Sequence, residues 1–173
     1  MASCELIYYR DLWEDLASKI PRWDPEESFF DVKDYLRFAV VSGMSPQAVE
    51  PIFVAAIQEI AARRPQPYKH VLFPREHTKS STICSLATYI LAYPHQNIWG
   101  PRVRIAFDAE VMELSERNTG VVIQALETNP VVLQECGNQK PDRKFLKENG
   151  ISKTNAPWNI RKFKTLNCLR QEL

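Results

Sequence analysis

The chain has 173 residues, of which 45% are hydrophobic and 25% are charged, values typical of a folded globular protein rather than a disordered chain. Its 5 glycines are about 3% of the residues against a usual ~7%, which disfavours glycine-rich phosphate loops and hairpin-rich all-β folds. The net charge is +1, so no overall field marks a nucleic acid or a membrane as a partner.

The charge is distributed unevenly along the chain. Residues 1–60 contain 5 basic and 11 acidic residues, residues 61–138 are nearly balanced, and residues 139–173 contain 9 basic and 3 acidic residues. Such an asymmetry has two interpretations. Either the two ends of one fold pair with each other and solvate its surface, or the basic C-terminal segment 139–173 binds an acidic partner.

The cysteines and the N-terminus indicate the cellular compartment. The four cysteines are far apart and form no C-x-x-C pair, and the first residues lack the basic-then-apolar pattern of a secretory signal. We therefore expect free thiols in an intracellular, cytoplasmic protein, with a nuclear location left open. The most apolar stretch, Thr82 to Tyr93, is much shorter than the ~20 residues that span a bilayer, so no membrane partner is expected.

Helical periodicity dominates the first 43 residues. Apolar residues three and four positions apart predict a helix from Ser3 to about Ile20. The segment Asp24-Pro25-Glu26-Glu27 offers an N-cap, a proline at the first helical position and a glutamate that can reach back to the cap. It predicts a second helix that starts there and ends at Gly43.

The next segments predict a third helix and a central one. Ser45-Pro46 repeats the start signal for a helix that reaches Arg64 and either kinks at Pro51 or begins there. Residues 65–81 contain three prolines and no helical period, which indicates a proline-rich surface excursion of the kind that is often functional. Residues 82–93 are apolar almost all round, which predicts a helix buried in the centre of the domain.

The second half of the chain is more ambiguous. Residues 101–118 fit one amphipathic helix, or a strand over 103–107 followed by a helix after Asp108. For residues 121–126 we favour helix over strand, whereas residues 131–133 fit either state. In the single-helix interpretation the inward side chains are Val103, Phe107, Val111, Met112 and Leu114.

The C-terminal segment predicts two more helices. Pro141-Asp142 opens a short helix that Gly150 closes, and Asn155-Ala156-Pro157 precedes a last helix with Trp158, Phe163, Leu166 and Leu169. The predicted fold is therefore all-α: one domain over residues 1–173, a compact bundle of about seven helices around the buried central helix, with one or two short strands allowed.

Catalytic and metal-binding patterns are weak. The chain has no G-x-S-x-G elbow and no phosphate-loop motif. Cys84 lies between His77 and His95 in sequence, but its apolar helix favours a buried thiol over a nucleophile. His70 and His77 lack zinc-ligand spacing, and Pro74 between them breaks a helix.

We therefore expect no enzyme activity, metal or cofactor. A hydrolase using Cys84 and histidines, or acid pairs such as Glu26/Glu27, Asp31/Asp34 and Glu110/Glu113, is the third hypothesis.

Basic residues interleaved with aromatic ones form the most specific pattern. Lysine and arginine neutralise phosphates, and aromatic rings offer stacking faces to unpaired bases. In a last helix, Arg161 and Lys164 would share a face, with Trp158 one turn earlier. The C-terminal candidates for nucleic-acid binding are Lys140, Arg143, Lys144, Lys147, Trp158, Arg161, Lys162 and Lys164. A second group around the excursion, interleaved with Tyr68, His70 and His77, consists of Arg63, Arg64, Lys69, Arg75 and Lys79.

These patterns predict a non-enzymatic binding protein that holds an acidic macromolecule, RNA above all, on a basic face containing aromatic residues. The alternative is an adaptor or inhibitor that engages a host or cellular protein through its acidic N-terminal helices, with self-association as one form. A simpler interpretation of the last helix is that its aromatic residues anchor it to the core while its cations solvate the outer face.

Overall fold

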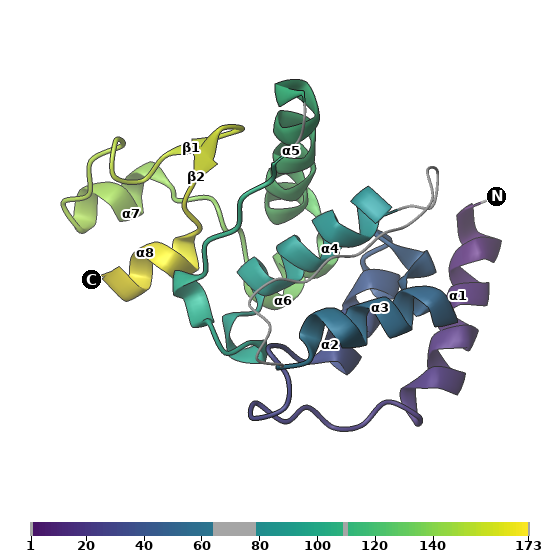
Figure 1. Cartoon of the computed structure of the whole chain (residues 1–173). Helices are drawn as coiled ribbons and strands as arrows, with labels where there is room; N and C mark the ends of the chain where they lie inside the picture. The colour runs from purple at the N-terminus through teal and green to yellow at the C-terminus, as the bar shows by residue number, and fades with distance from the viewer. Residues whose placement is uncertain (1, 64–78, 109–110, 173) are drawn as a thin grey trace.

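The computed structural model describes residues 2–63, 79–108 and 111–172, with side chains from Ile7 onward in the first helix. These residues form eight α-helices, three short 3-10 helices and one two-stranded antiparallel hairpin (Figure 1). The predicted all-α class is therefore confirmed, including its allowance for short strands. No helix in this part of the chain is long and apolar enough to cross a membrane.

In chain order the elements are α1 (Ala2–Ala17), α2 (Val32–Val41), η1 (Pro46–Val49), α3 (Pro51–Ala61), α4 (Lys79–Ala92), η2 (Pro94–Gln96), η3 (Gly100–Arg102), α5 (Met112–Thr128), α6 (Pro130–Cys136), α7 (Arg143–Glu148), β1 (Trp158–Asn159), β2 (Lys162–Phe163) and α8 (Leu166–Glu172). Helix α1 lies at one side of the molecule, and α7, the hairpin and α8 lie at the opposite side (Figure 1). Most of the proline-rich excursion lies outside the described residues.

Helix α4 is the buried central helix that the sequence predicts. Nine of its 14 residues are buried, and it packs against α2 and α5. Two buried hydrogen bonds attach it to the N-terminal half of the chain. The Tyr35 hydroxyl donates to the Thr82 carbonyl (3.1 Å), and the hydroxyls of Ser45 and Thr82 are 2.9 Å apart. Because an unpaired buried hydroxyl costs about 1–3 kcal/mol, these bonds favour one register of α4 against α2.

The predicted start of the second helix at Asp24 is wrong. Asp24 caps a single turn, in which its carboxylate accepts the Glu26 N–H (2.8 Å), but the helix begins only at Val32, after the N-cap Asp31. Between them, the main chain at Phe29 bonds to the last residue of α3 (2.7 Å) and to Ile98 (2.9 Å). These long-range bonds compete with the local helix and hold the segment extended.

The neighbouring helix boundaries also differ in part from the predictions. Helix α1 ends at Ala17 rather than near Ile20. The third helix follows the second of its two alternatives: η1 is a separate 3-10 turn, and α3 begins at Pro51 and ends at Ala61. Proline suits the first position of a helix because it has no N–H group, and the N–H at that position never bonds within the helix.

Residues 103–118 match the second predicted alternative in part, because a helix follows Asp108 and begins at Met112, but residues 103–107 are not a strand. Residues 103–108 are irregular and run beside α5, where the Ser115 hydroxyl donates to the Phe107 carbonyl (2.6 Å). Of the five side chains expected to point inward, Val103 and Phe107 pack against the core. The other three are exposed, with accessible fractions of 47% for Val111, 61% for Met112 and 50% for Leu114.

The exposure of these three side chains follows from where α5 is anchored. Its buried residues are all in its second half, at Val122, Ala125 and Leu126. The first half extends beyond α4, as the upper end of the green helix in Figure 1 shows. Amphipathic periodicity therefore predicted the helix correctly but not how far the core reaches along it.

Residues 121–126 are helical, as favoured, and residues 131–133 belong to α6. The Asn129 side chain caps α6 by accepting the N–H groups of Val131 (3.0 Å) and Val132 (3.4 Å). Its amide also donates to the Ser42 carbonyl (3.1 Å), which joins the start of α6 to the end of α2. The short helix α7 begins after the N-cap Asp142 and is followed by Gly150 at a φ of 63°, as predicted.

The predicted helix from Trp158 is wrong, because residues 158–163 form a hairpin and α8 begins only at Leu166. Trp158 pairs with Phe163 across the strands, and the ring centroids are 5.3 Å apart at 73°. The Asn159 side chain accepts the N–H groups of Arg161 and Lys162, both at 3.0 Å, which closes the turn. A spacing of five residues suits this cross-strand aromatic pair better than one face of a helix.

Two hydrophobic clusters are present among the described residues. The larger one takes most of its buried residues from α2, α3 and α4 and extends to α5 and α6. The smaller one lies in the C-terminal segment and contains the buried residues Leu146, Ala156 and Leu169, with Phe145 and Ile151 packed against them. We call α7, the hairpin and α8, residues 139–172, the C-terminal lobe.

Candidate functional site

The C-terminal lobe is attached to α5 through two glutamates. Glu116 and Glu127 are eleven positions apart, about three helical turns, so both lie on one face of α5. Near the hairpin turn, Arg161 Nε is 3.0 Å from Glu116 Oε1. At the hairpin base, the Trp158 indole donates to Glu127 Oε1, and Lys140 Nζ is 2.9 Å from the same oxygen. We call Glu116, Glu127 and these three partners the α5 clamp.

The clamp depends on an ionised Glu127. The hydrogen bond from Lys140 lowers the pKa of Glu127, and the bond from Trp158 lowers it further, whereas partial burial acts in the opposite direction. Glu127 therefore carries its negative charge at neutral pH. Because one oxygen accepts from both partners, the charge on Glu127 holds the base of the hairpin and Lys140, three residues before the start of α7.

Trp158 and Phe163 serve as anchors of the hairpin. Both are half-buried and pack against the larger cluster, in addition to their contact with each other. This geometry matches the anchoring interpretation of these rings rather than a free stacking face. The exposed apolar residue of the hairpin is Ile160 in its turn, with 46% of its surface accessible.

Four of the predicted cations form ion pairs with glutamates of the same chain. Besides the two in the α5 clamp, Lys164 Nζ lies 2.9 Å from Glu172, and Lys144 Nζ lies 3.9 Å from Glu148. Exposed pairs of this kind contribute only about 0–1 kcal/mol. A phosphate can therefore compete for an exposed cation such as Lys144 at little cost.

Three other predicted cations of the lobe are exposed, and their side chains form no hydrogen bond or ion pair within the described chain. Arg143 and Lys147 are on α7, and Lys162 is on β2. The expected helical face shared by Arg161, Lys164 and Trp158 does not exist, because Arg161 lies in the hairpin turn against α5 and Lys164 contacts α8. The available charge of the lobe is therefore centred on α7 and the hairpin.

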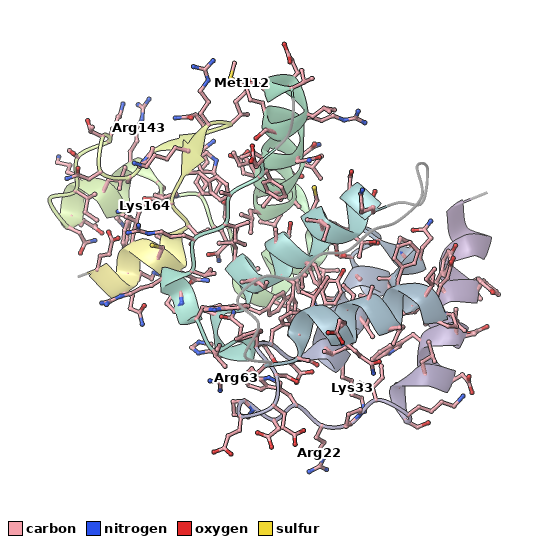
Figure 2. The ribbon with its side chains drawn as sticks, in the orientation of Figure 1. Arg22, Lys33, Arg63, Met112, Arg143 and Lys164 are labelled. Atoms are coloured by element: carbon pink, nitrogen blue, oxygen red, sulfur yellow. The ribbon has the colours of Figure 1, made fainter. Side chains whose placement is uncertain are left out.

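The second predicted group is placed only in part. Arg63 is exposed just after α3, where its guanidinium donates to the Pro25 carbonyl, and Lys79 is the exposed first residue of α4. Figure 2 shows Arg63 at the lower edge of the molecule, away from Arg143 and Lys164, so Arg63 is not on the C-terminal lobe. Arg64, Lys69 and Arg75 lie outside the described residues, as do Tyr68, His70 and His77.

Sequence reasoning missed three cations that lie on or beside the lobe. Lys153 and Arg170 are exposed within it, and Arg102 approaches it through a bond to the Gln171 carbonyl (3.5 Å). The first two belong to the basic segment but stand apart from its clusters. No local signal marks Arg102, since only the tertiary contact between η3 and α8 brings it there.

No protein-family model, curated protein or solved structure matches this chain.

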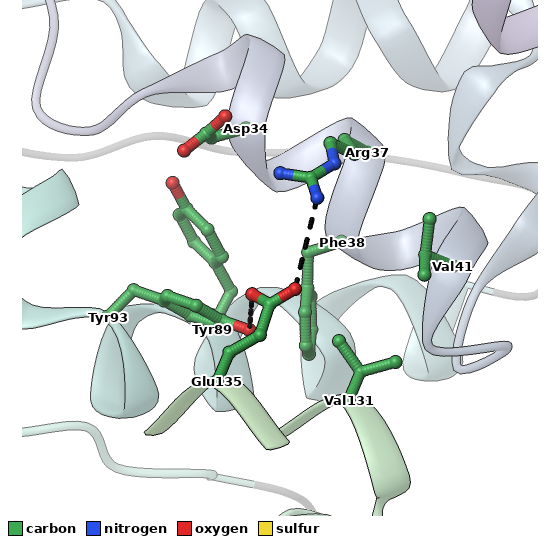
Figure 3. Close-up of a pocket in the computed structure, with 8 residues that line it drawn as sticks. All are labelled: Asp34, Arg37, Phe38, Val41, Tyr89, Tyr93, Val131 and Glu135. Atoms are coloured by element: carbon green, nitrogen blue, oxygen red, sulfur yellow. Dashed lines mark hydrogen bonds and ion pairs between the residues drawn. The ribbon is translucent and has the colours of Figure 1, made fainter. Parts of the chain in front are cut away.

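One pocket with acidic lining lies between α2, α4 and α6 (Figure 3). The Tyr93 hydroxyl donates to Glu135 (2.8 Å), and Arg37 lies 3.9 Å from the same carboxylate. Burial is the largest cause of a raised pKa at Asp34, and the charge of Asp31 adds to it. The cavity of about 20 Å³ has room for about one water molecule, so side chains rather than a substrate-sized space fill this region.

Cys84 is a buried thiol, as its apolar helix predicts. Its Sγ faces the Asn118 carbonyl at 3.7 Å, and burial raises the pKa of the thiol to about 11. The thiolate needed for nucleophilic attack is therefore scarce at neutral pH. His95 lies exposed on η2, and His77 is outside the described residues.

We expect Asp34→Asn to stabilise the protein at pH 7. Because the folded state raises the pKa of Asp34, it binds this proton more tightly than the unfolded chain does. The wild type therefore loses stability as the pH rises from the ordinary range of aspartate through the raised pKa. The variant lacks this loss. Its urea midpoint should therefore be higher than that of the wild type at pH 7, and the difference should shrink toward pH 4. An equal difference at both pH values contradicts a raised pKa of Asp34.

Proposed function

We propose that the protein is a non-enzymatic binding protein whose C-terminal lobe holds RNA through its phosphates. The observation that carries the proposal is the charge of the lobe. Residues 139–172 contain nine basic and three acidic residues, and Arg143, Lys147 and Lys162 among them are exposed without a partner in the described chain. Cations of this kind bind phosphates and release the counterions condensed on a nucleic acid.

Two structural features support a fixed arrangement of these cations. Helix α7 carries Arg143 and Lys147 one turn apart on its exposed surface, and its Leu146 is buried in the smaller cluster. The hairpin that carries Lys162 is attached to α5 by the α5 clamp. Both elements therefore hold their charges on packed structure rather than on a free tail.

Binding through phosphates predicts weak sequence preference. Because Trp158 and Phe163 pack against the core, their faces are used within the protein rather than offered to bases. Contacts to phosphates position a protein on nucleic acid but carry no sequence information by themselves. We therefore expect single-stranded RNAs of different sequence and equal length to bind with similar affinity.

The test is a pair of charge-reversal variants with the same change in net charge. Arg143→Glu with Lys147→Glu should weaken oligonucleotide binding at least tenfold at ~50 mM salt and lower the log–log salt slope by about 1.4–1.8. The control is Arg22→Glu with Lys33→Glu, at the lower edge of the molecule in Figure 2, and it should bind like the wild type. Circular dichroism checks that both variants remain helical.

Two results overturn the proposal. One is that the wild-type protein binds no oligonucleotide at ~50 mM salt, where electrostatic binding is strong. The other is an equal loss in both variants, which means that net charge rather than the lobe governs binding. A partner that survives nuclease treatment and depends on the same two residues identifies the ligand as an acidic protein instead.

A second function, protein–protein interaction through the acidic N-terminal helices, is favoured by one observation. Ile7 and Tyr8 are exposed on α1, with accessible fractions of 51% and 62%, beside acidic side chains.

A further inference from the structure

The asparagine that ends α7 is followed by a glycine. Asn149 is the C-cap residue of the helix, and Gly150 follows it with a φ of 63°. None of the other asparagines in the sequence precedes a glycine. Because glycine has no Cβ, its main-chain nitrogen can approach the side chain of the preceding asparagine with little hindrance. This pair is therefore the place in the chain where an asparagine amide is most open to attack by the next main-chain nitrogen.

Such an attack converts asparagine into an acidic residue without an enzyme. The Gly150 nitrogen loses its proton to solvent and bonds to Cγ of Asn149, while the bond from Cγ to Nδ2 breaks. The amide nitrogen takes up a proton and leaves as ammonia, and the main chain is left with a five-membered succinimide ring. Water then opens the ring at either carbonyl and gives aspartate or isoaspartate. Water is the only co-reactant, and both residues are exposed to it.

In the folded protein both reacting groups are held apart by hydrogen bonds. The side-chain amide of Asn149 donates to the Phe145 carbonyl (2.9 Å), back along the helix. The N–H of Gly150, which is the attacking group, donates to the Lys147 carbonyl (3.3 Å). The two groups can therefore meet only after this end of α7 has opened.

A further bond and an apolar contact keep the helix end closed. The Ile151 N–H donates to the Leu146 carbonyl (2.9 Å), and with the bond from Gly150 it forms a Schellman motif. The Ile151 side chain packs against the smaller cluster, in which Leu146 is buried. Because that cluster contains only three buried residues, the end of α7 opens at a lower free-energy cost than the core around α4.

We propose that Asn149 is a site of spontaneous deamidation, and that its rate is set by how often the C-terminal end of α7 opens. The closed Schellman motif protects the asparagine, and the open helix end exposes it. Since ammonia is lost to solvent, each molecule reacts once and does not return. The site is thus a slow, irreversible switch built into the C-terminal lobe.

Both products weaken the helix end that protected the asparagine. Aspartate in place of Asn149 lacks the amide donor for the Phe145 carbonyl, and it puts a negative charge at the negative end of the helix dipole. Isoaspartate adds one carbon to the main chain before Gly150. That insertion moves the N–H groups of Gly150 and Ile151 out of register with their acceptors in α7.

The effect of deamidation on binding rests on the function proposed above. The new negative charge lies two residues from Lys147, one of the exposed cations of α7. With RNA held through Arg143 and Lys147, this charge repels the phosphates and should weaken binding about two- to threefold at low salt.

Peptide mapping by mass spectrometry tests the site and its protection. The full chain is incubated at mildly alkaline pH, in buffer and in denaturing guanidinium chloride. In the denaturant, Asn149 should react faster than every other asparagine of the chain. In buffer it should react at least ~tenfold more slowly, because the helix end must open first. Equal rates in the two solutions overturn the protection by α7, and a different asparagine that reacts first in the denaturant overturns the site.

A variant that loosens the helix end without changing the reacting atoms tests the protection in the folded protein. Leu146→Ala removes a buried side chain from the smaller cluster and should speed the reaction at Asn149 in buffer at least ~threefold. The matched control Leu114→Ala makes the same change at an exposed leucine of α5 and should react like the wild type. An unchanged rate in folded Leu146→Ala contradicts the proposal. If circular dichroism shows that this variant is unfolded, the comparison of buffer and denaturant decides.

Two substitutions at the site separate the modification from its effect on RNA. Asn149→Gln keeps an uncharged amide, and because its reaction needs a six-membered ring, it should stay unmodified in the denaturant and bind RNA like the wild type. Asn149→Asp reproduces one product and should show the weaker binding. Equal binding by the two variants overturns the effect on RNA but not the modification, which the masses report. A wild type that binds no RNA overturns the proposed function and leaves the masses unchanged.

Discussion

Leu126→Ala is expected to lower the free energy of unfolding by about 2–5 kcal/mol. Leu126 is fully buried where α5 packs against α4, and both helices are held by several neighbours. A cavity at this contact therefore cannot collapse easily, and the lost packing adds to the lost burial of the side chain. Urea denaturation followed by circular dichroism measures the change.

The matched control for this variant is on the same helix. Leu114→Ala makes the same chemical change at a residue that is 50% accessible and beyond the core. It should change the free energy of unfolding by less than about 0.5 kcal/mol, as surface substitutions usually do. Similar losses in the two variants contradict the boundary of the core along α5.

Glu127→Ala is expected to release the C-terminal lobe from α5 before the rest of the protein unfolds. The substitution leaves the half-buried Trp158 indole without its acceptor and Lys140 without its counterion, a loss of about 1–3 kcal/mol. The smaller cluster has only three buried residues to offset that loss. Hydrogen exchange should therefore accelerate across residues 139–172 while α4 stays protected.

The pH dependence gives this prediction a second readout. Because the folded state lowers the pKa of Glu127, the clamp contributes stability above the ordinary range of glutamate, and that stability is lost as the pH falls through the lowered value. Acidification should therefore loosen the lobe of the wild type. Glu127→Gln keeps an acceptor for Trp158 but no charge, so it should show a smaller loss at pH 7 and no such acid step. An acid step of equal size in this variant assigns the effect to another carboxylate.

The elements predicted correctly are those whose signal is local. The stretch from Thr82 to Tyr93 is apolar on every side, and such a pattern needs a buried position whatever the rest of the fold is. The cap at Asp142 and the glycine at 150 define α7 in the same way. By contrast, the turn at Asp24 fails to propagate because Phe29 finds main-chain partners on α3 and at Ile98, which no local pattern reveals.

The candidate site was predicted in composition but not in arrangement. Sequence identified the basic segment 139–173, yet Arg161 and Lys140 bind glutamates that lie 45 and 13 residues earlier on α5. Whether a lysine is paired or available depends on such contacts, and periodicity does not report them. The hairpin had a recognisable signal in Asn159 and in the five-residue spacing of Trp158 and Phe163, but helical neighbours outweighed it.

The Glu127 oxygen that accepts both bonds also limits the conformational freedom of the segment that carries Arg143 and Lys147. Since Lys140 and Trp158 both end on Oε1, residues 141–157 form a loop closed at its base, as a cross-link would close it. Arg143 and Lys147 are inside that loop. Opening it would give this segment more conformational freedom, and the entropy lost when Arg143 and Lys147 settle on a phosphate would then oppose binding.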